Sequence, residues 1–291
     1  MTVDSVLSAR LCRRALGRYG HAAIGLTVAF VLVTGCYQQS EPAPQEAIQV
    51  LASLLHDREA SVRHSAAEAL GKIGDQSAEP LLVESLHDAD ARVREASAQG
   101  LSRLSSVSPE AATELVSLLR DTDPVVRRAA TQALAMAEGT PALASSLERL
   151  LSSVDVAVRQ SAAQAFFLFD SPPASSLEAL SNRSRDSDPV VRRWAVAALG
   201  ESGDPQALAI LVDRLRHDPI DDVRAEAAYR LRFVGNASIG DDLRTVAERG
   251  GNGQVRRWAE TSLGAIRKES GCGSALPPDR LTAPGPSRRY P

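Results

Sequence analysis

Apolar and polar positions recur along the chain with a period typical of paired amphipathic helices. A Val-Arg dipeptide returns every 31 to 33 residues, with its arginine at Arg63, Arg94, Arg127, Arg159, Arg192, Arg224 and Arg256. Ala or Ser stands four residues after each of these valines, and Leu or Phe stands eight residues after it. A spacing of four residues keeps side chains on one helical face. The pattern therefore predicts seven copies of one amphipathic helix, and a period of this length indicates a structural repeat.

A leucine-rich segment precedes each of these helices and predicts a partner helix. Prolines stand 32 residues apart at the expected starts of four such segments, at Pro109, Pro141, Pro173 and Pro205. Before four of the second helices stands an acidic residue that can accept hydrogen bonds from free helical amides, namely Asp90, Asp123, Asp155 and Asp188. Glycines follow several second helices, where we expect left-handed helix ends, at Gly74, Gly139, Gly203 and Gly235. Each repeat is thus predicted to be a helical hairpin, and the chain to be all-α.

Three of the repeats carry a resemblance to a known family. The segments HDREASVRHSAAEALGKIGD, RDTDPVVRRAATQALA and RDSDPVVRRWAVAALGESGD resemble HEAT repeats, in particular the PBS-lyase HEAT-like type. The resemblance implies an α-solenoid of about seven hairpins over residues 45–269, wound as a right-handed superhelix. It also implies a hydrogen-bonded ladder in which the repeated Arg pairs with an Asp six residues before it. The expected pairs are Asp57/Arg63, Asp88/Arg94, Asp121/Arg127, Asp186/Arg192 and Asp218/Arg224. Ser153 and Gly250 stand at the Asp position of repeats four and seven, so we expect the ladder to be interrupted there.

Residues 1–35 have the layout of an export signal. Four arginines precede an uncharged run from Ala22 to Thr34, which is short for a membrane span of about 20 residues. The segment VTGC that ends at Cys36 resembles the lipobox of bacterial lipoproteins, which implies cleavage before Cys36 and its lipidation. A buried cysteine in a hydrophobic hairpin and an uncleaved anchor are the alternatives. We therefore expect a membrane-anchored lipoprotein of the bacterial cell envelope, with residues 36–44 as a short linker. The export route and the choice between inner and outer membrane stay open.

The charge balance narrows the choice of partners. The sequence has 33 Lys and Arg against 36 Asp and Glu, and removal of residues 1–35 leaves 29 basic and 35 acidic residues, a net charge of −6. Such a balance argues against a nucleic-acid partner, because the phosphate backbone attracts basic surfaces. Residues 270–291 lack apolar periodicity and predict a disordered tail.

Candidate chemistry is limited to a recurring histidine. The pairs His56-Asp57, His87-Asp88 and His217-Asp218 occupy one phase of the repeat. They are similar to the His-Glu pairs with which deoxyhypusine hydroxylase, an iron-dependent branch of the HEAT-repeat proteins, holds its di-iron centre. Here Asp replaces Glu, three pairs stand instead of four, and each Asp already has a ladder position, so we predict no metal and no cofactor. The sequence also lacks a nucleophile elbow, a glycine-rich phosphate loop and a CxxC motif, which leaves catalytic residues unassigned.

Large aromatic residues concentrate in the second half of the chain, on or near the predicted second helices. The candidate partner-binding residues are Phe167, Trp194, Tyr229, Phe233 and Trp258, with Arg193 and Arg257 beside the two tryptophans. Trp, Tyr and Arg are typical anchors of protein interfaces, and second helices of such hairpins line an extended concave surface. The competing interpretation is that these rings fill space between hairpins. The sequence therefore favours a non-catalytic protein-protein interaction scaffold with no small-molecule substrate. The alternative is a HEAT-repeat enzyme relative, an iron-dependent hydroxylase or a bilin lyase.

Overall fold

A computed structural model describes residues 44–271, except for 138 and 170–171. The chain divides into two compact units, Met1–Ala47 and Ile48–Pro291, and the packing described below is that of the second unit. The expected export signal, the expected lipidation site at Cys36 and most of the expected tail lie outside the described residues. Within the described ranges, no helix combines the length and the apolar character needed to cross a membrane.

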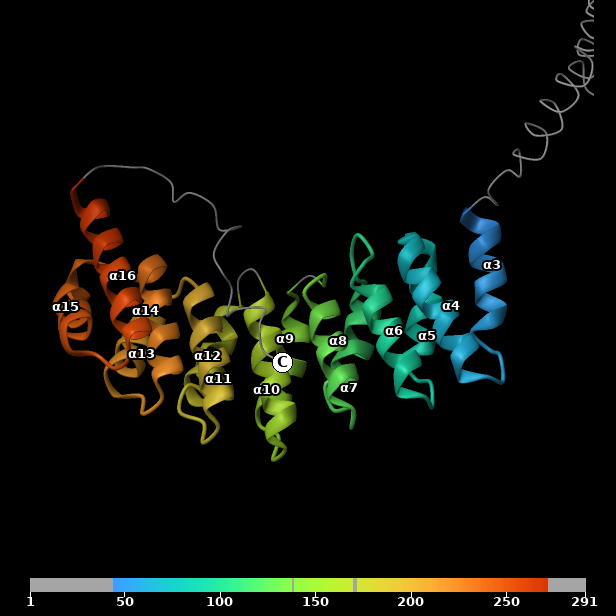
Figure 1. Cartoon of the computed structure of the whole chain (residues 1–291), viewed down its shortest axis with the longest axis horizontal. Helices are drawn as coiled ribbons and strands as arrows, with labels where there is room; N and C mark the ends of the chain where they lie inside the picture. The colour runs from blue at the N-terminus through green and yellow to red at the C-terminus, as the bar shows by residue number, and fades with distance from the viewer. Residues whose placement is uncertain (1–43, 138, 170–171, 272–291) are drawn as a thin grey trace, which may run out of the picture. The chain divides into compact units, whose positions relative to one another are not determined.

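The described residues form helical hairpins in the order that the repeats predict (Figure 1). The first helices are α3 (Pro44–Leu54), α5 (Glu79–Ser85), α7 (Pro109–Leu118), α9 (Pro141–Leu151), α11 (Leu177–Arg183), α13 (Pro205–His217) and α15 (Gly240–Arg249). The second helices are α4 (Ala60–Ile73), α6 (Ala91–Leu101), α8 (Pro124–Leu134), α10 (Val156–Leu168), α12 (Pro189–Glu201), α14 (Asp221–Val234) and α16 (Gly253–Gly271). Short 3₁₀ turns precede α5, α11 and α15, at Gln76–Ala78, Ala174–Ser176 and Ala237–Ile239. The expectation of an all-α solenoid is confirmed.

Local hydrogen bonds explain where the second helices begin. Each of the four predicted aspartates precedes its helix in an extended conformation and accepts a hydrogen bond from an amide of the first turn. The Asp188 carboxylate accepts from two such amides, those of Val190 and Val191. Ser108, Thr140 and Asp204 cap first helices in the same way, each followed by a proline that has no amide hydrogen to satisfy.

The second helices form one row and the first helices another, and together they enclose a continuous apolar core. In the row of second helices, α4 packs on α6, α6 on α8, and so on to α14 on α16. The repeated Val, Ala and Leu or Phe positions face this core, as Val191, Ala195 and Leu199 of α12 show by being fully buried. Because each hairpin contacts mainly its neighbours, the apolar face of one repeat is covered only when the next repeat stacks on it.

The glycines at helix ends differ from the expectation in part. Gly74 and Gly203 adopt the left-handed conformation, with φ of 68° and 65°. Gly235 does not: its φ is −71°, and the chain leaves α14 in an extended conformation. A side chain at Gly235 would still be excluded, since a Cβ there would lie 2.3 Å from the Leu231 carbonyl oxygen. At this helix end a close approach of the backbone, and not left-handed geometry, requires glycine.

Candidate functional site

A ladder of ion pairs runs along the turns that join the two helices of each repeat. Four arginines present Nε and Nη2 to both oxygens of an aspartate in the following repeat. The pairs are Arg63–Asp88 (Nε to Oδ2, 2.6 Å), Arg94–Asp121 (2.7 Å), Arg159–Asp186 (3.0 Å) and Arg192–Asp218 (2.8 Å). Such bidentate, charge-assisted contacts are stronger than neutral hydrogen bonds and fix the geometry of both groups. The ladder therefore links neighbouring repeats in register.

The pairing within the ladder corrects the expectation from the sequence. Arg63 was expected to pair with the Asp57 side chain, but its Nη1 donates to the Asp57 main-chain carbonyl (2.8 Å) while its Nε and Nη2 reach Asp88. The Asp57 carboxylate instead accepts a hydrogen bond from the Glu59 amide (2.8 Å) and closes its own turn. The later ladder aspartates both shape their own turn and receive an arginine from the repeat before, namely Asp88, Asp121, Asp186 and Asp218.

The ladder lacks a carboxylate at the two positions where Asp is replaced. Arg224, which precedes Gly250, contacts the Asp221 carboxylate of its own turn instead. Arg127, which precedes Ser153, donates through Nη1 to the carbonyls of Asp121 (2.6 Å) and Thr122 (3.1 Å). Within the described residues, its Nε and Nη2 have no carboxylate partner.

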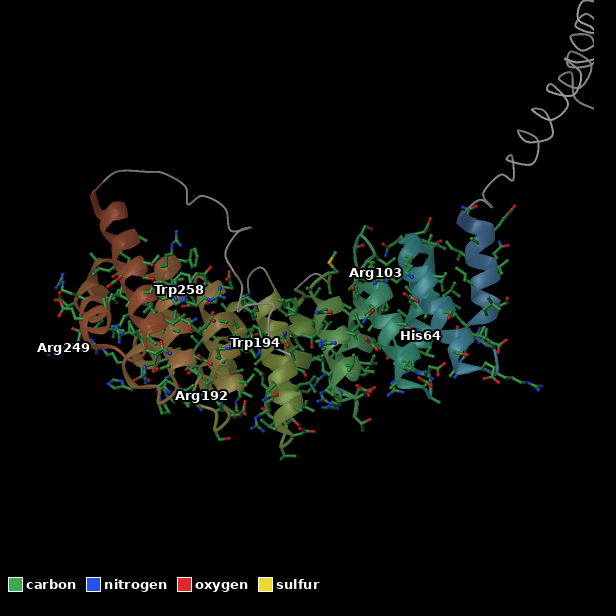
Figure 2. The ribbon with its side chains drawn as sticks, viewed as in Figure 1. His64, Arg103, Arg192, Trp194, Arg249 and Trp258 are labelled. Carbon is green, nitrogen blue, oxygen red and sulfur yellow. The ribbon has the colours of Figure 1, made fainter. Side chains whose placement is uncertain are left out.

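The predicted aromatic residues gather on four consecutive second helices. The Phe167 ring of α10 lies 5.3 Å from that of Trp194 on α12, measured between ring centroids. The Tyr229 ring of α14 lies 4.7 Å from that of Trp258 on α16 and 5.4 Å from that of Phe233. Figure 2 shows Trp194 and Trp258 in this half of the chain, with Arg192 of the ladder nearer the turns. We call these five residues the aromatic cluster.

Arg230, which the sequence analysis did not select, joins the two parts of the aromatic cluster. Its guanidinium carbon lies 4.9 Å from the Phe167 ring centroid and 5.1 Å from that of Tyr229. It is buried, and it pairs with Glu226 (Nε to Oε1, 2.7 Å) and with Glu201. Gly200 makes room for it, because a Cβ at that position would lie 2.6 Å from the Arg230 Cβ and Cδ. The signal in the sequence was the repeat phase: six residues after the ladder arginine the other repeats carry only Ala, Gly or Ser, at Ala69, Gly100, Ala133, Ala165, Ala198 and Ser262.

Exposure separates the residues that a partner can reach from those that support them. Tyr229 is 5% exposed, its hydroxyl group has no hydrogen-bond partner among the described residues, and burial raises its pKa. Tyr229 is therefore packed and not presented. Phe233 is 45% exposed, whereas Trp194, Trp258 and Phe167 are half-buried. The accessible part of the cluster is thus an apolar surface made by Phe233 and by the exposed parts of Trp194, Trp258 and Phe167.

Two arginines border this surface. The Arg193 guanidinium carbon lies 5.2 Å from the Trp194 ring centroid, and Arg257 is exposed beside Trp258. Cations near the face of an aromatic ring are attracted by its quadrupole, which holds the Arg193 side chain close to the surface. The rim of the aromatic cluster is therefore cationic.

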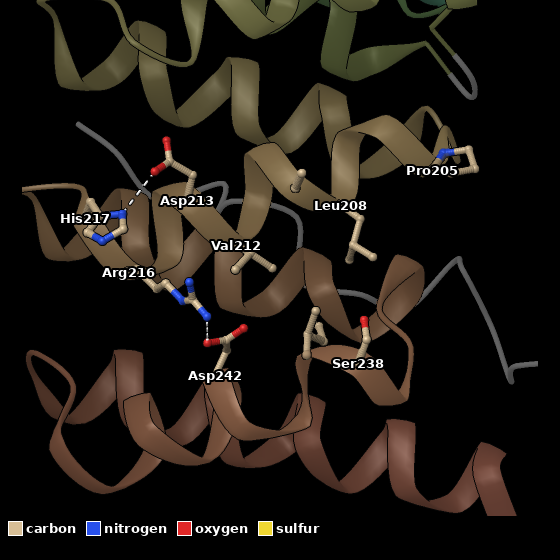
Figure 3. Close-up of a pocket in the computed structure, with 10 residues that line it drawn as sticks. Pro205, Leu208, Val212, Asp213, Arg216, His217, Ser238 and Asp242 are labelled. Carbon is tan, nitrogen blue, oxygen red and sulfur yellow. Dashed lines mark hydrogen bonds and ion pairs between the residues drawn. The ribbon is translucent and has the colours of Figure 1, made fainter.

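A pocket of about 470 Å³ lies in the row of first helices, between α13 and α15 (Figure 3). Its lining includes Leu208 and Val212, with charged groups at one end. The Arg216 guanidinium pairs with Asp242, and the His217 Nδ1 lies 3.0 Å from an Asp213 carboxylate oxygen. Because these charged groups pair with one another, the pocket offers a ligand few unpaired charged or hydrogen-bonding groups.

The histidines of the His-Asp pairs lie apart from one another. His87 contacts Glu114 (3.2 Å), and His217 contacts Asp213, while Asp88 and Asp218 receive ladder arginines. Among the described residues, no three His, Cys, Asp or Glu side chains are grouped closely enough to hold a metal ion.

Stacked helical hairpins joined by an Asp-Arg ladder define the class of the protein as an α-solenoid. The sequence matches the HEAT repeats family in four overlapping segments, residues 14–102, 48–135, 99–167 and 143–232. Since these matches cover more than half of its length, the chain belongs to the HEAT-repeat family. The comparison of the sequence with curated proteins found no match.

The comparison with solved structures found proteins of different kinds. Kap95 in its complex with Nup1 matches with a TM-score of 0.58 at 15% identity, over 77% of this chain and 36% of Kap95, so this chain spans about a third of that protein. The complex of CpcE and CpcF of phycocyanin lyase from Nostoc sp. matches with a TM-score of 0.46 at 20% identity, over 79% of this chain and 96% of that one. Human deoxyhypusine hydroxylase in complex with glycerol matches with a TM-score of 0.37 at 21% identity, over 76% and 85% of the two chains. At 15% identity the similarity to Kap95 shows the fold alone.

Proposed function

We propose that this protein is a non-catalytic protein-protein interaction scaffold that is lipid-anchored in the bacterial cell envelope. The observation that carries the binding function is the aromatic cluster, which presents a partly exposed apolar surface with a cationic rim. Trp, Tyr and Arg are enriched among the few residues that contribute most of the binding energy at protein interfaces. The fixed position of Arg230 between Phe167 and Tyr229 keeps the cluster ordered before a partner arrives.

The repeat architecture supports this proposal. HEAT hairpins give an extended surface whose individual positions vary without loss of the fold, because each repeat depends only on its neighbours. One solved solenoid with the same fold, Kap95, is known in a complex with another protein, Nup1. We extend this use of the fold to the present chain and assign the second helices α10 to α16 as the partner-facing row.

Partner capture with matched variants tests the binding function. Phe233→Ser removes the most exposed ring of the cluster, and Ile220→Ser removes a similarly exposed apolar side chain, 40% against 45%, from the turn between α13 and α14. We expect Phe233→Ser to reduce crosslinked partner by about tenfold, since a well-placed interface ring contributes about 1.4 kcal/mol or more. Ile220→Ser should leave capture unchanged. Equal capture by the two variants would contradict the assignment.

The lipid anchor rests on the sequence that ends at Cys36. A single acyl chain binds a membrane only reversibly, whereas two or more chains anchor a protein stably. Cys36→Ser removes the acceptor thiol, so the variant should move from the membrane fraction to the soluble fraction, and radiolabelled palmitate should no longer be incorporated. Continued membrane association of Cys36→Ser would overturn the anchor and leave the binding surface untouched.

A further inference from the structure

The ladder contains one arginine whose carboxylate partner is missing. In the intact rungs, two carbonyls of its own turn orient the guanidinium through Nη1, and Nε and Nη2 then bind the next aspartate. Arg192 shows this arrangement, with Nη1 on the carbonyls of Asp186 and Ser187 and with Nε and Nη2 on Asp218. Arg127 keeps the two carbonyl contacts but faces Ser153. It is therefore held in the orientation that binds a carboxylate.

Ser153 replaces the aspartate in one of its two roles. Its Oγ accepts a hydrogen bond from the Asp155 amide (3.2 Å), as the Asp121 carboxylate accepts from the Asp123 amide (2.9 Å) in the repeat before. The turn is thus preserved, while the second carboxylate oxygen and the negative charge that would reach Arg127 are lost.

At the other interruption of the ladder, a carboxylate of the chain itself pairs with the arginine, whereas no described carboxylate pairs with Arg127. At repeat seven the Asp221 carboxylate, three residues before Arg224, takes the free guanidinium. The residue three before Arg127 is Pro124, which has no acidic group. Among the described residues, Arg127 is thus the ladder arginine that lacks a carboxylate although a further repeat follows it.

The surroundings of Ser153 combine a second arginine, as in the other rungs, with exposed apolar side chains. Arg159 borders the position from the other side, since its Nη1 donates to the carbonyls of Ser153 (3.0 Å) and Val154 (3.1 Å). Val154 is fully exposed and Val156 is 40% exposed. At the position of Val154 the other repeats carry Arg58, Ala89, Thr122, Ser187, Pro219 and Gly251. We call Arg127, Ser153, Val154, Val156 and Arg159 the repeat-four gap.

We propose that the repeat-four gap binds an aspartate or glutamate side chain of a partner protein, with a small apolar side chain of the same segment against Val154 and Val156. A carboxylate in the gap would lie between two arginines, as Asp121 lies between Arg94 and Arg127. A protein carboxylate is favoured over a free inorganic anion because the gap combines a planar two-donor edge with exposed apolar side chains. The inference rests on the proposed function only in that the ligand belongs to a protein; the gap lies at the turns and the aromatic cluster does not.

The same environment in an intact rung favours the charged carboxylate. Burial raises the pKa of Asp121, but the hydrogen bond from Arg94, that from the Asp123 amide and the charges of Arg94 and Arg127 outweigh it and hold the pKa below its usual value. Arg127 is common to this rung and to the gap, and Arg159 borders the gap as Arg127 borders Asp121, so an incoming carboxylate meets a cationic position.

Side-chain NMR of the full chain, labelled with ¹⁵N-arginine and held in detergent, tests the proposal. The probe is the peptide acetyl-Val-Glu-Val-amide, and the Nε–H resonance of Arg127, identified by its loss in Arg127→Gln, is the readout. We expect a saturable downfield shift of this resonance, with no such shift at Arg128, an exposed neighbour in the same helix. The absence of a saturable shift would overturn the proposal.

A matched variant supplies the missing group. Ser153→Asp restores the residue that stands at this position in repeats one, two, three, five and six, so it is compatible with the fold. Before peptide is added, the Arg127 Nε–H resonance of this variant should lie close to those of Arg63 and Arg94. The peptide should bind the variant at least about tenfold more weakly than the wild type, a difference of about 1.4 kcal/mol. Unchanged affinity in Ser153→Asp would contradict the assignment of the gap.

Two further titrations distinguish a protein carboxylate from a free anion, and the repeat-four gap from the aromatic cluster, as the cause of the Arg127 shift. If sodium sulfate shifts the Arg127 resonance and the peptide does not, the gap is an adventitious anion site and the proposal fails. Phe233→Ser should leave the peptide titration unchanged. Failure of the aromatic cluster as a partner surface is therefore distinguishable from failure of the repeat-four gap.

Discussion

Removal of a ladder arginine should be much more damaging where its carboxylate is present than where it is absent. Arg192 and Asp218 form the most buried rung, with side chains 8% and 0% exposed. Arg192→Gln leaves the Asp218 charge buried without its main partner, and breaking a buried pair in this way destabilises a protein by about 3 to 5 kcal/mol. Asp218 retains the Ile220 amide (3.0 Å) and a more distant contact with Arg214 (3.6 Å). We therefore expect a loss near the lower end, about 3 kcal/mol.

Arg127→Gln is the matched control, because Arg127 makes the same carbonyl contacts without a carboxylate. Both substitutions remove the two hydrogen bonds from Nη1, which at the lower limit of about 0.5 kcal/mol each contribute about 1 kcal/mol together. The difference of about 2 kcal/mol between the two variants then isolates the bidentate contact. Urea denaturation followed by circular dichroism measures both losses. Equal losses would refute the reasoning that the ladder carboxylates hold neighbouring repeats together.

Two other predictions follow from the packing and from acid titration. The hydrogen bond from Arg63 lowers the pKa of Asp88 against the opposing effect of burial, so its contribution is complete above about pH 5 and is lost as pH falls from the unfolded value of about 3.9 through the lower folded value. The difference in urea midpoint between the wild type and Asp88→Ser should accordingly shrink between pH 7 and pH 3, and a constant difference would contradict this. Gly71→Ala places a Cβ 2.5 Å from the Gly100 Cα and must separate α4 from α6, a loss of about 1 to 3 kcal/mol. Gly264→Ala, with no atom within 4 Å of its new Cβ, should instead stabilise α16 by about 0.5 to 1 kcal/mol, and thermal unfolding of both variants checks the opposite signs.

The fold could be predicted from the sequence because each repeat carries the same pattern of apolar and polar residues. A single amphipathic segment is ambiguous, but seven in-phase Val-Arg positions constrain period, helix faces and caps together. The partner of each arginine could not be predicted in the same way. Arg63 lies close in the chain to Asp57 and far from Asp88, and only the stacking of repeats brings the second carboxylate within reach.

The candidate binding surface, too, could be predicted from the sequence only in part. The repeat phase placed Trp194 and Trp258 at equivalent positions, and the structure puts both into one aromatic cluster. The burial of Tyr229 was not predictable, because it depends on how closely the Trp258 ring of the next helix approaches. Arg230 was missed because a charged residue in a second helix is ordinarily solvated, and its burial requires Glu201, Glu226 and the space above Gly200.

The claim that the row of second helices is the partner-facing surface is tested most directly by site-specific photocrosslinking in intact cells. A photoreactive phenylalanine derivative at position 233 reports on the aromatic cluster, and the same group at position 220 reports on the turn between α13 and α14. The account predicts one discrete crosslinked species from position 233 that is absent from position 220 and is lost when Trp258 is changed to Ser. Crosslinks of equal yield from both positions, or none from position 233, would contradict it.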